Sequence, residues 1–230
     1  MIRRTGPRSQ LIHVLSVLVF FLFSMQSVAV AQMLTVAETE ALVRAGYFEG
    51  MPEDDAARIG PAGAERLVEM LLDPTEGRSH NQILLALGLC GSPDALAAIL
   101  DWSATVDGVA TVNGVATVNG VATLDRDTFK AWQALPYALG HLTHFDRRAV
   151  GVLETLMNAE APGWTFRHYT GARLVDLARR SAATSLALTG LPEARGALDR
   201  AGGRTSDARF EAHLRNVRAL HAERASEVAR

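Results

Sequence analysis

Residues 86–95 read Ala-Leu-Gly-Leu-Cys-Gly-Ser-Pro-Asp-Ala, and this phrase governs how the rest of the chain is interpreted. Its first half continues a helical pattern, and the glycine followed by Ser-Pro is typical of one helix ending and another beginning. Residues 185–194, which lie 99 positions later, read Ser-Leu-Ala-Leu-Thr-Gly-Leu-Pro-Glu-Ala. A shorter copy, Ala-Leu-Gly-His-Leu, stands at 138–142, 52 positions after the first. The chain therefore carries an internal repeat built around helix ends.

The segments around these phrases also have helical periodicity. Thr35 and Glu38 form a capping box that predicts a short helix ending near Gly46. Further helices are expected over 64–72, 80–90, 94–102, 147–157 and 206–228. The last of these carries an apolar stripe of Phe210, Leu214, Val217 and Leu220 or His221. We expect it to cap a helical stack or to dock a partner.

The phrase at 86–95 resembles the junction between HEAT repeats, especially the short HEAT-like repeats of bacterial and phycobilisome-lyase-type proteins. In that family the second helix ends in an Ala-Leu-Gly-x-Leu-Gly-like phrase, and Pro-Glu-Ala or Asp-Pro-x-Ala opens the next repeat. The copy at 188–194 fits in part, because Ala187 replaces the middle glycine, and the copy at 138–142 lacks the proline. The resemblance covers about residues 63–200 and implies an all-α fold, a short α-solenoid of HEAT-like helix pairs. The alternative is a helical bundle without repeats.

Residues 106–123 break the helical pattern with the hexapeptides Val-Asp-Gly-Val-Ala-Thr, once, and Val-Asn-Gly-Val-Ala-Thr, twice. Glycine and β-branched residues disfavour helix, and Asp-Gly and Asn-Gly are typical of tight β-turns. The segment is either a small β-meander or a low-complexity loop inserted within one helix pair. The loop is favoured because removing these 18 residues from the 52-residue spacing leaves 34, a common length for a helical repeat.

Residues 1–31 have the three parts of a secretory signal peptide: early arginines, an apolar run from Leu11 to Met25, and an Ala-x-Ala site ending at Ala31. Cleavage after Ala31 would place the protein in the periplasm or outside the cell. The alternative is an uncleaved inner-membrane anchor over residues 11–31, since about 20 apolar residues span a bilayer. The expected organisation is therefore a signal peptide at 1–31, a solenoid at 32–205 and a C-terminal helix at 206–230.

Composition excludes several classes of protein. The 230 residues are 48% hydrophobic, which is too apolar for a disordered chain. Without the three arginines of residues 1–31, 20 basic and 25 acidic residues remain, a net charge of −5. That balance gives no attraction to nucleic acid. The single cysteine, Cys90, excludes an intramolecular disulfide framework and is expected to be a small buried apolar residue.

Two clusters are candidate sites. His141, His144 and Asp146 combine imidazole and carboxylate ligands near a helix end, and they are the candidate metal site. The second cluster is the densest aromatic segment of the chain, and aromatic side chains are frequent anchors of protein interfaces. Its candidate partner-binding residues are Trp164, Phe166, Arg167, His168 and Tyr169. These aromatics could equally fill the core between two repeats.

No catalytic signature accompanies these clusters: the sequence lacks a His-Glu-x-x-His motif, a Gly-x-Ser-x-Gly elbow, a P-loop and a dinucleotide fingerprint. We therefore expect an exported scaffold that binds a protein or peptide, with no cofactor and no catalytic residues. The alternative is a periplasmic metal- or small-ligand-binding protein or enzyme that uses His141, His144 and Asp146.

Overall fold

The computed structural model describes residues 32–47, 50–108, 117–118 and 121–228. The predicted signal peptide, residues 1–31, lies outside the described residues. In the part that is described, no helix is both long enough and apolar enough to cross a bilayer. Residues 33–230 make up one unit of the fold.

Helices dominate the described part of the chain, which is all-α apart from three short strands. The helices are α2 (Val36–Arg44), α3 (Glu53–Ala56), α4 (Pro61–Leu72), η1 (Pro74–Glu76), α5 (His80–Cys90), α6 (Ala95–Gly108), α7 (Arg126–Leu142), α8 (Arg148–Met157), α9 (Gly171–Thr189), α10 (Pro192–Arg204) and α11 (Ala208–Val228). The strands are β1 (Thr117–Val118), β2 (Val121–Thr123) and β3 (Trp164–Thr165).

The predicted helix ends are formed by the residues that signalled them. Thr35 accepts a hydrogen bond from the Glu38 backbone, and Glu38 accepts one from the Thr35 backbone, which completes the capping box. Gly91 and Gly190 follow α5 and α9 with φ angles of 67° and 66°, in the left-handed region where a side chain is strained. The two phrases therefore end their helices in the same way.

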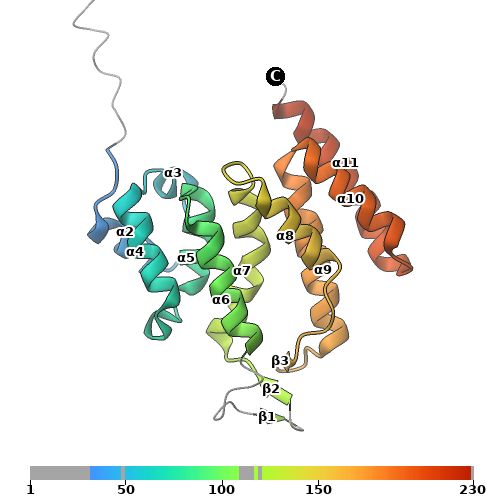
Figure 1. The fold of residues 1–230 in the computed structure, drawn as a ribbon, viewed down its shortest axis with the longest axis horizontal. Helices are drawn as coiled ribbons and strands as arrows, with labels where there is room; N and C mark the ends of the chain where they lie inside the picture. The colour runs from blue at the N-terminus through green and yellow to red at the C-terminus, as the bar shows by residue number, and fades with distance from the viewer. Residues whose placement is uncertain (1–31, 48–49, 109–116, 119–120, 229–230) are drawn as a thin grey trace, which may run out of the picture. The chain divides into compact units, whose positions relative to one another are not determined.

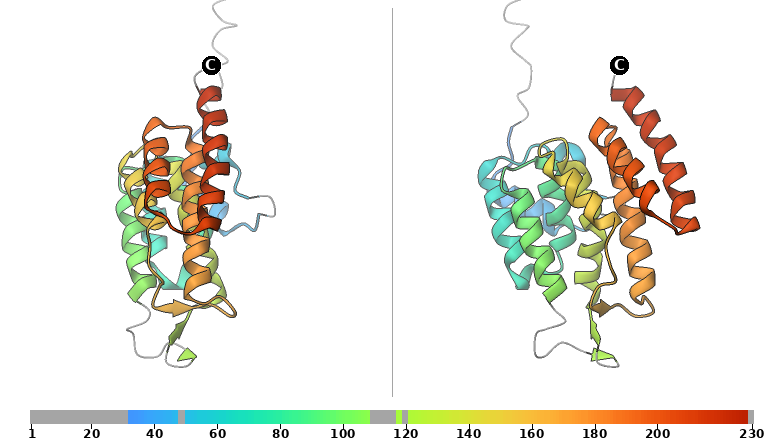
Figure 2. Two further views of the ribbon diagram at one scale, coloured as in Figure 1. Left: turned by 90° about the vertical axis from the view of Figure 1, so that its right-hand side faces the viewer. Right: turned by 45° about the vertical axis from the view of Figure 1, so that its right-hand side comes forward.

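The helices from α4 onward alternate between two layers (Figures 1 and 2). Helices α5, α7, α9 and α11 pack against one another in sequence, whereas α4 packs on α6 and α8 packs on α10. Each helix also contacts the next one along the chain. The N-terminal helices α2 and α3 lie against α4 and α5. The core lies between the two layers, where Leu87, Leu139 and Leu186 are buried at the same position of their phrases.

Four helix predictions differ from the structure at their ends. Helix α4 begins at Pro61 rather than Ala64, α8 at Arg148 rather than Arg147, and α11 at Ala208 rather than Ser206. Helix α6 begins at Ala95 rather than Asp94 and continues to Gly108, beyond the expected end at Trp102. Trp102 and Val106 are one helical turn apart and both buried, so packing holds the extra turn in the helix. The apolar stripe of α11 is confirmed, because Phe210, Leu214, Val217 and His221 are all buried.

The described part of the hexapeptide segment forms a hairpin. β1 pairs antiparallel with β2, and β2 pairs parallel with β3, in the order β1-β2-β3. Residues 106–108 belong to the last turn of α6, so the predicted break in the helix is wrong for these three positions. The rest of the segment lies between α6 and α7 in the chain, as expected for an insertion, and strands β1 and β2 support the β-meander interpretation. Residues 109–116 and 119–120 lie outside the described residues. The strands thus join the insertion to the segment before α9.

Candidate functional site

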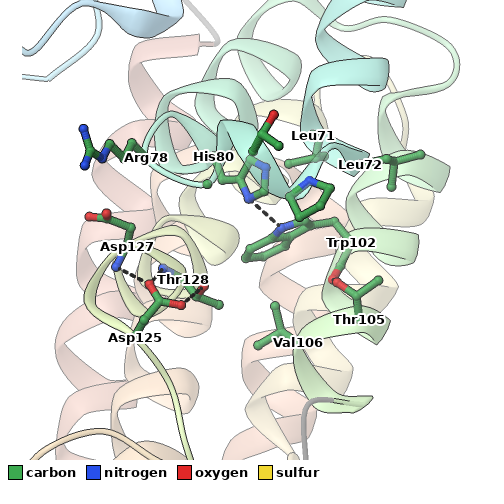
Figure 3. Close-up of a pocket in the computed structure, with 13 residues that line it drawn as sticks. Leu71, Leu72, Arg78, His80, Trp102, Thr105, Val106, Asp125, Asp127 and Thr128 are labelled. Carbon is green, nitrogen blue, oxygen red and sulfur yellow. Dashed lines mark hydrogen bonds between the residues drawn. The ribbon is translucent and has the colours of Figure 1, made fainter. Parts of the chain in front are cut away.

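A groove opens among helices α4, α5, α6 and α7, and it is the candidate binding site. Its volume is about 650 Å³, within the range of about 300–1,000 Å³ that is typical of ligand sites. The end of α4, the start of α5, the second half of α6 and the start of α7 contribute its walls (Figure 3). Its lining residues include Leu71, Leu72, Arg78, His80, Trp102, Thr105, Val106, Asp125, Asp127 and Thr128.

The floor of the groove is apolar and is fixed by two hydrogen bonds. The Trp102 indole donates to Nδ1 of His80 over 3.2 Å, and Nε2 of His80 donates to the Asp73 carbonyl over 3.1 Å. Because the indole can only donate, the proton of this imidazole resides on Nε2. The buried side chains of Leu71 and Val106 complete the floor. The groove is therefore preformed by contacts among three helices.

The rim combines an apolar and a charged side (Figure 3). Leu72, the last residue of α4, is 50% exposed and forms the apolar side. On the other side, the exposed Arg78 has no ion-pair partner among the described residues. Asp125 caps α7 by accepting hydrogen bonds from the backbones of Asp127 and Thr128. Burial raises the pKa of Asp125, but its hydrogen bonds outweigh burial, so its pKa is lowered and it carries charge.

The sequence predicted that His80 and Trp102 lie in helices, but it did not predict the contact between them. Twenty-two residues separate them, and neither helical periodicity nor a motif marks their contact. The one local signal at the groove was the Asp-x-x-Thr pattern of Asp125 and Thr128, which forms an N-cap. The groove itself arises from packing of segments that are far apart in the sequence.

The predicted aromatic cluster divides into core and surface. The Phe166 ring stacks on Phe129 of α7 with centroids 4.0 Å apart, and Trp164 meets Trp132 edge-on at 5.0 Å. Both Trp164 and Phe166 are buried, and they pack the β3 segment against α7. A partner protein therefore cannot contact them directly.

The other three candidate residues of that segment lie at the surface. Arg167, His168 and Tyr169 are exposed, and the Arg167 guanidinium lies over the Phe166 ring, 5.2 Å from its centroid. The five predicted partner-binding residues therefore do not share one surface. The sequence also allowed these aromatic residues to fill the core, and Trp164, the largest of them, does so.

The predicted metal site is not formed. Among the residues that the structure describes, no three His, Cys, Asp or Glu side chains are grouped to hold a metal ion, and His141, His144 and Asp146 are no exception. Asp146 is engaged elsewhere: its carboxylate accepts hydrogen bonds from the Arg148 side chain at 2.6–3.0 Å. The hydrogen bonds from Arg148 lower the pKa of Asp146, so its carboxylate is charged and paired with Arg148.

The two histidines instead line a small cavity of about 70 Å³ between α7 and α9, together with Tyr137, Ser185 and Leu188. Burial lowers the pKa of His141, with Glu53 opposing and His144 adding to the shift. Burial also lowers the pKa of His144, helped by the charge of Arg147. Both imidazoles are therefore neutral near pH 7.

Cys90, the one cysteine, is only partly buried and lies at the end of α5. Burial raises the pKa of its thiol, and its Sγ donates a weak hydrogen bond of 3.7 Å to the Leu87 carbonyl. A thiol with a raised pKa is a poor nucleophile, so Cys90 is not a catalytic candidate.

No protein-family model, curated protein or solved structure matches this chain.

Proposed function

We propose that this protein is an exported HEAT-like α-solenoid that acts as a scaffold and binds a peptide segment of a partner protein in the groove between its first two helix pairs. The occupant is a segment with an apolar anchor side chain for the Trp102–Leu71 floor and an acidic residue for Arg78. The observation that carries the proposal is this groove: a preformed apolar floor beside an exposed leucine and an unpaired cation.

The repeat assignment is supported by a contact that recurs at matching positions. A methyl group added to Gly88 would overlap the Ala138 carbonyl oxygen, and one added to Gly140 would lie 3.0 Å from Cβ of Ser185. In both cases the third residue of one phrase meets the first residue of the next phrase. Small residues at these positions let the backbones of successive helices approach closely, which favours stacked copies of one unit.

The groove supports peptide binding because it combines the two components of an interface anchor. Fully burying an apolar side chain of the peptide in the groove, against the exposed Leu72, would supply about 1.5–3 kcal/mol. Arg78 would add a charge pair at the rim, which contributes mainly to specificity and to the rate of association. A short segment with both features can therefore be distinguished from unrelated sequences.

A peptide library displayed on phage, selected against the immobilised full chain, tests the proposal. We expect enriched peptides to share an apolar residue near an acidic one, and we expect Leu72→Glu to weaken their binding, measured by fluorescence anisotropy, at least about tenfold. Arg78→Glu should weaken the binding of peptides that contain the acidic residue. It should not change the binding of peptide variants in which that residue is replaced by glutamine.

Leu100→Glu is the matched control, because Leu100 is an α6 leucine that is 40% exposed and does not line the groove. Its affinity for the selected peptides should equal that of the wild type. Peptides that bind equally well to the Leu72→Glu and Leu100→Glu proteins would contradict binding in the groove, and a library without enrichment would contradict peptide binding itself.

Export is the second component of the proposal and rests on residues 1–31 alone. N-terminal sequencing of the protein recovered from the periplasm or the medium should begin at Gln32. A chain that retains Met1 in the membrane fraction would support the uncleaved anchor instead.

A further inference from the structure

The α7–α9 cavity contains a serine that breaks the repeat. The first residue of the phrase is alanine in two copies, Ala86 and Ala138, but it is Ser185 in the third. Ser185 is 2% exposed, and its hydroxyl has no hydrogen-bond partner among the described residues. A buried hydroxyl without a partner costs free energy that alanine would not cost. Such departures from a local pattern are expected at functional sites.

Three more polar groups face the same cavity without a partner. The side chains of Tyr137, His141 and His144 line it, and none of the three makes a side-chain hydrogen bond to the rest of the described chain. Each neutral imidazole carries one N–H, and each hydroxyl can donate one hydrogen bond. These four side chains therefore border a volume of about 70 Å³, which is enough for about two water molecules or one carboxylate group, and the Ser185 hydroxyl is the one among them that is fully buried without a partner in the described part of the chain.

The surroundings favour an acid with an apolar stem. Tyr137 and Leu188 flank the cavity and are 40% and 42% exposed, so they offer an apolar surface at its mouth. Arg147 is close enough to His144 to lower its pKa, and its charge attracts an anion. The carboxylate of Glu53 acts on His141 in the opposite sense. The His144 side of the cavity is therefore the side that favours an anion.

We infer that the α7–α9 cavity is a binding site for the carboxylate of an amphipathic acid, with Ser185 as its deepest donor and the apolar stem on Tyr137 and Leu188. Each of the four groups can donate one hydrogen bond to a carboxylate oxygen, and the charge of Arg147 beside His144 favours a carboxylate over a neutral amide. The source of the carboxylate is either a free medium-chain acid or the C-terminus of an apolar peptide. This site is separate from the groove and does not depend on the proposed peptide binding there.

Isothermal titration of the full chain with octanoate, octanamide and an acetylated trileucine, free or amidated at its C-terminus, tests the inference. Octanoate should bind and octanamide should not. Ser185→Ala should weaken octanoate binding at least about tenfold, because a hydrogen bond to a charged group is lost. Tighter binding of the free trileucine than of octanoate would identify a peptide C-terminus as the source, and the reverse order would identify a free acid.

Two controls separate a binding role from a structural one. Ser185→Ala should fold, because alanine occupies this position in the other two phrases, and its Tm should equal or exceed that of the wild type. Ser181→Ala, one turn earlier on α9 and outside the cavity, should leave octanoate affinity unchanged. Equal binding of octanoate and octanamide, unchanged affinity in Ser185→Ala, or no heat of binding at millimolar octanoate would each overturn the inference.

Discussion

The contact between α5 and α7 and the contact between α7 and α9 use the same positions of the repeated phrase but differ in tightness. At the first contact Gly88 meets the backbone of Ala138, and a methyl group there would overlap a carbonyl oxygen. At the second, Gly140 meets the side chain of Ser185, and a methyl group would lie 3.0 Å from Cβ. Beside the second contact lies a cavity lined by polar residues. The difference indicates that these helices meet at matching positions of the phrases, whereas individual residues decide whether the contact is closed or leaves a cavity.

The largest expected effect is at the closed contact, which is the α5–α7 contact where Gly88 meets Ala138. Gly88→Ala should lower the free energy of unfolding by about 3 kcal/mol, the upper end of the usual cost of overpacking, because a backbone carbonyl cannot rotate away from the new methyl group. Chemical denaturation followed by circular dichroism measures it. Gly151→Ala is the control: that glycine lies inside α8 with nothing within 4 Å of the added methyl, so stability should rise by about 1 kcal/mol. A stable Gly88→Ala protein would contradict the closed contact.

Exchanging the first residues of the two phrases should act in opposite directions. Ala138→Ser would place a hydroxyl in the closed contact and should cost about 1–3 kcal/mol, the penalty of burying an unpaired polar group. Ser185→Ala removes such a group and should leave the unliganded protein more stable by about 1 kcal/mol. Denaturation curves measure both changes, and a cost of Ala138→Ser equal in size to the gain from Ser185→Ala would indicate that the two contacts are equivalent.

A smaller effect is expected from Gly140→Ala at the α7–α9 contact, which we call the open contact because a cavity lies beside it. The methyl group would press on the Ser185 side chain, but alanine also favours the helix by about 1 kcal/mol relative to glycine. The two effects nearly cancel, so the free energy of unfolding should change by less than about 1 kcal/mol. A loss as large as that of Gly88→Ala, measured in the same denaturation series, would remove the distinction between the contacts.

The smallest expected effect is a dependence on pH at the open contact alone. Leu89 occupies the position in α5 that corresponds to His141 in α7. Burial lowers the pKa of His141 in the folded state, so the unfolded chain, with a histidine pKa near 6.5, takes up the proton first. Stability should therefore be full above about pH 6.5 and fall as the pH drops toward the folded-state pKa. His141→Gln should reduce this slope in Tm measured between about pH 7 and 5, and an unchanged slope would contradict the shift.

The sequence alone identified the features that depend on neighbouring residues. The capping box of Thr35 and Glu38, the α5 helix over 80–90 and the left-handed glycine at Gly91 are confirmed, because their signals act within a few positions of the chain. The stripe of α11 is confirmed because its spacing of 3–4 residues places it on one helix face. The extension of α6 to Gly108 was missed, since it depends on where Trp102 and Val106 pack.

The candidate sites depended on contacts that no local pattern encodes. Asp146 was predicted as a metal ligand, yet it pairs with Arg148, and the histidines beside it face Ser185 on another helix. The groove likewise arises when Trp102 of α6 meets His80 of α5. Helix periodicity and turn chemistry therefore determined the all-α elements and the places where they end. Only the packing of distant segments decided which polar groups were satisfied and which were left facing a cavity, because hydrogen bonding and desolvation act through space rather than along the chain.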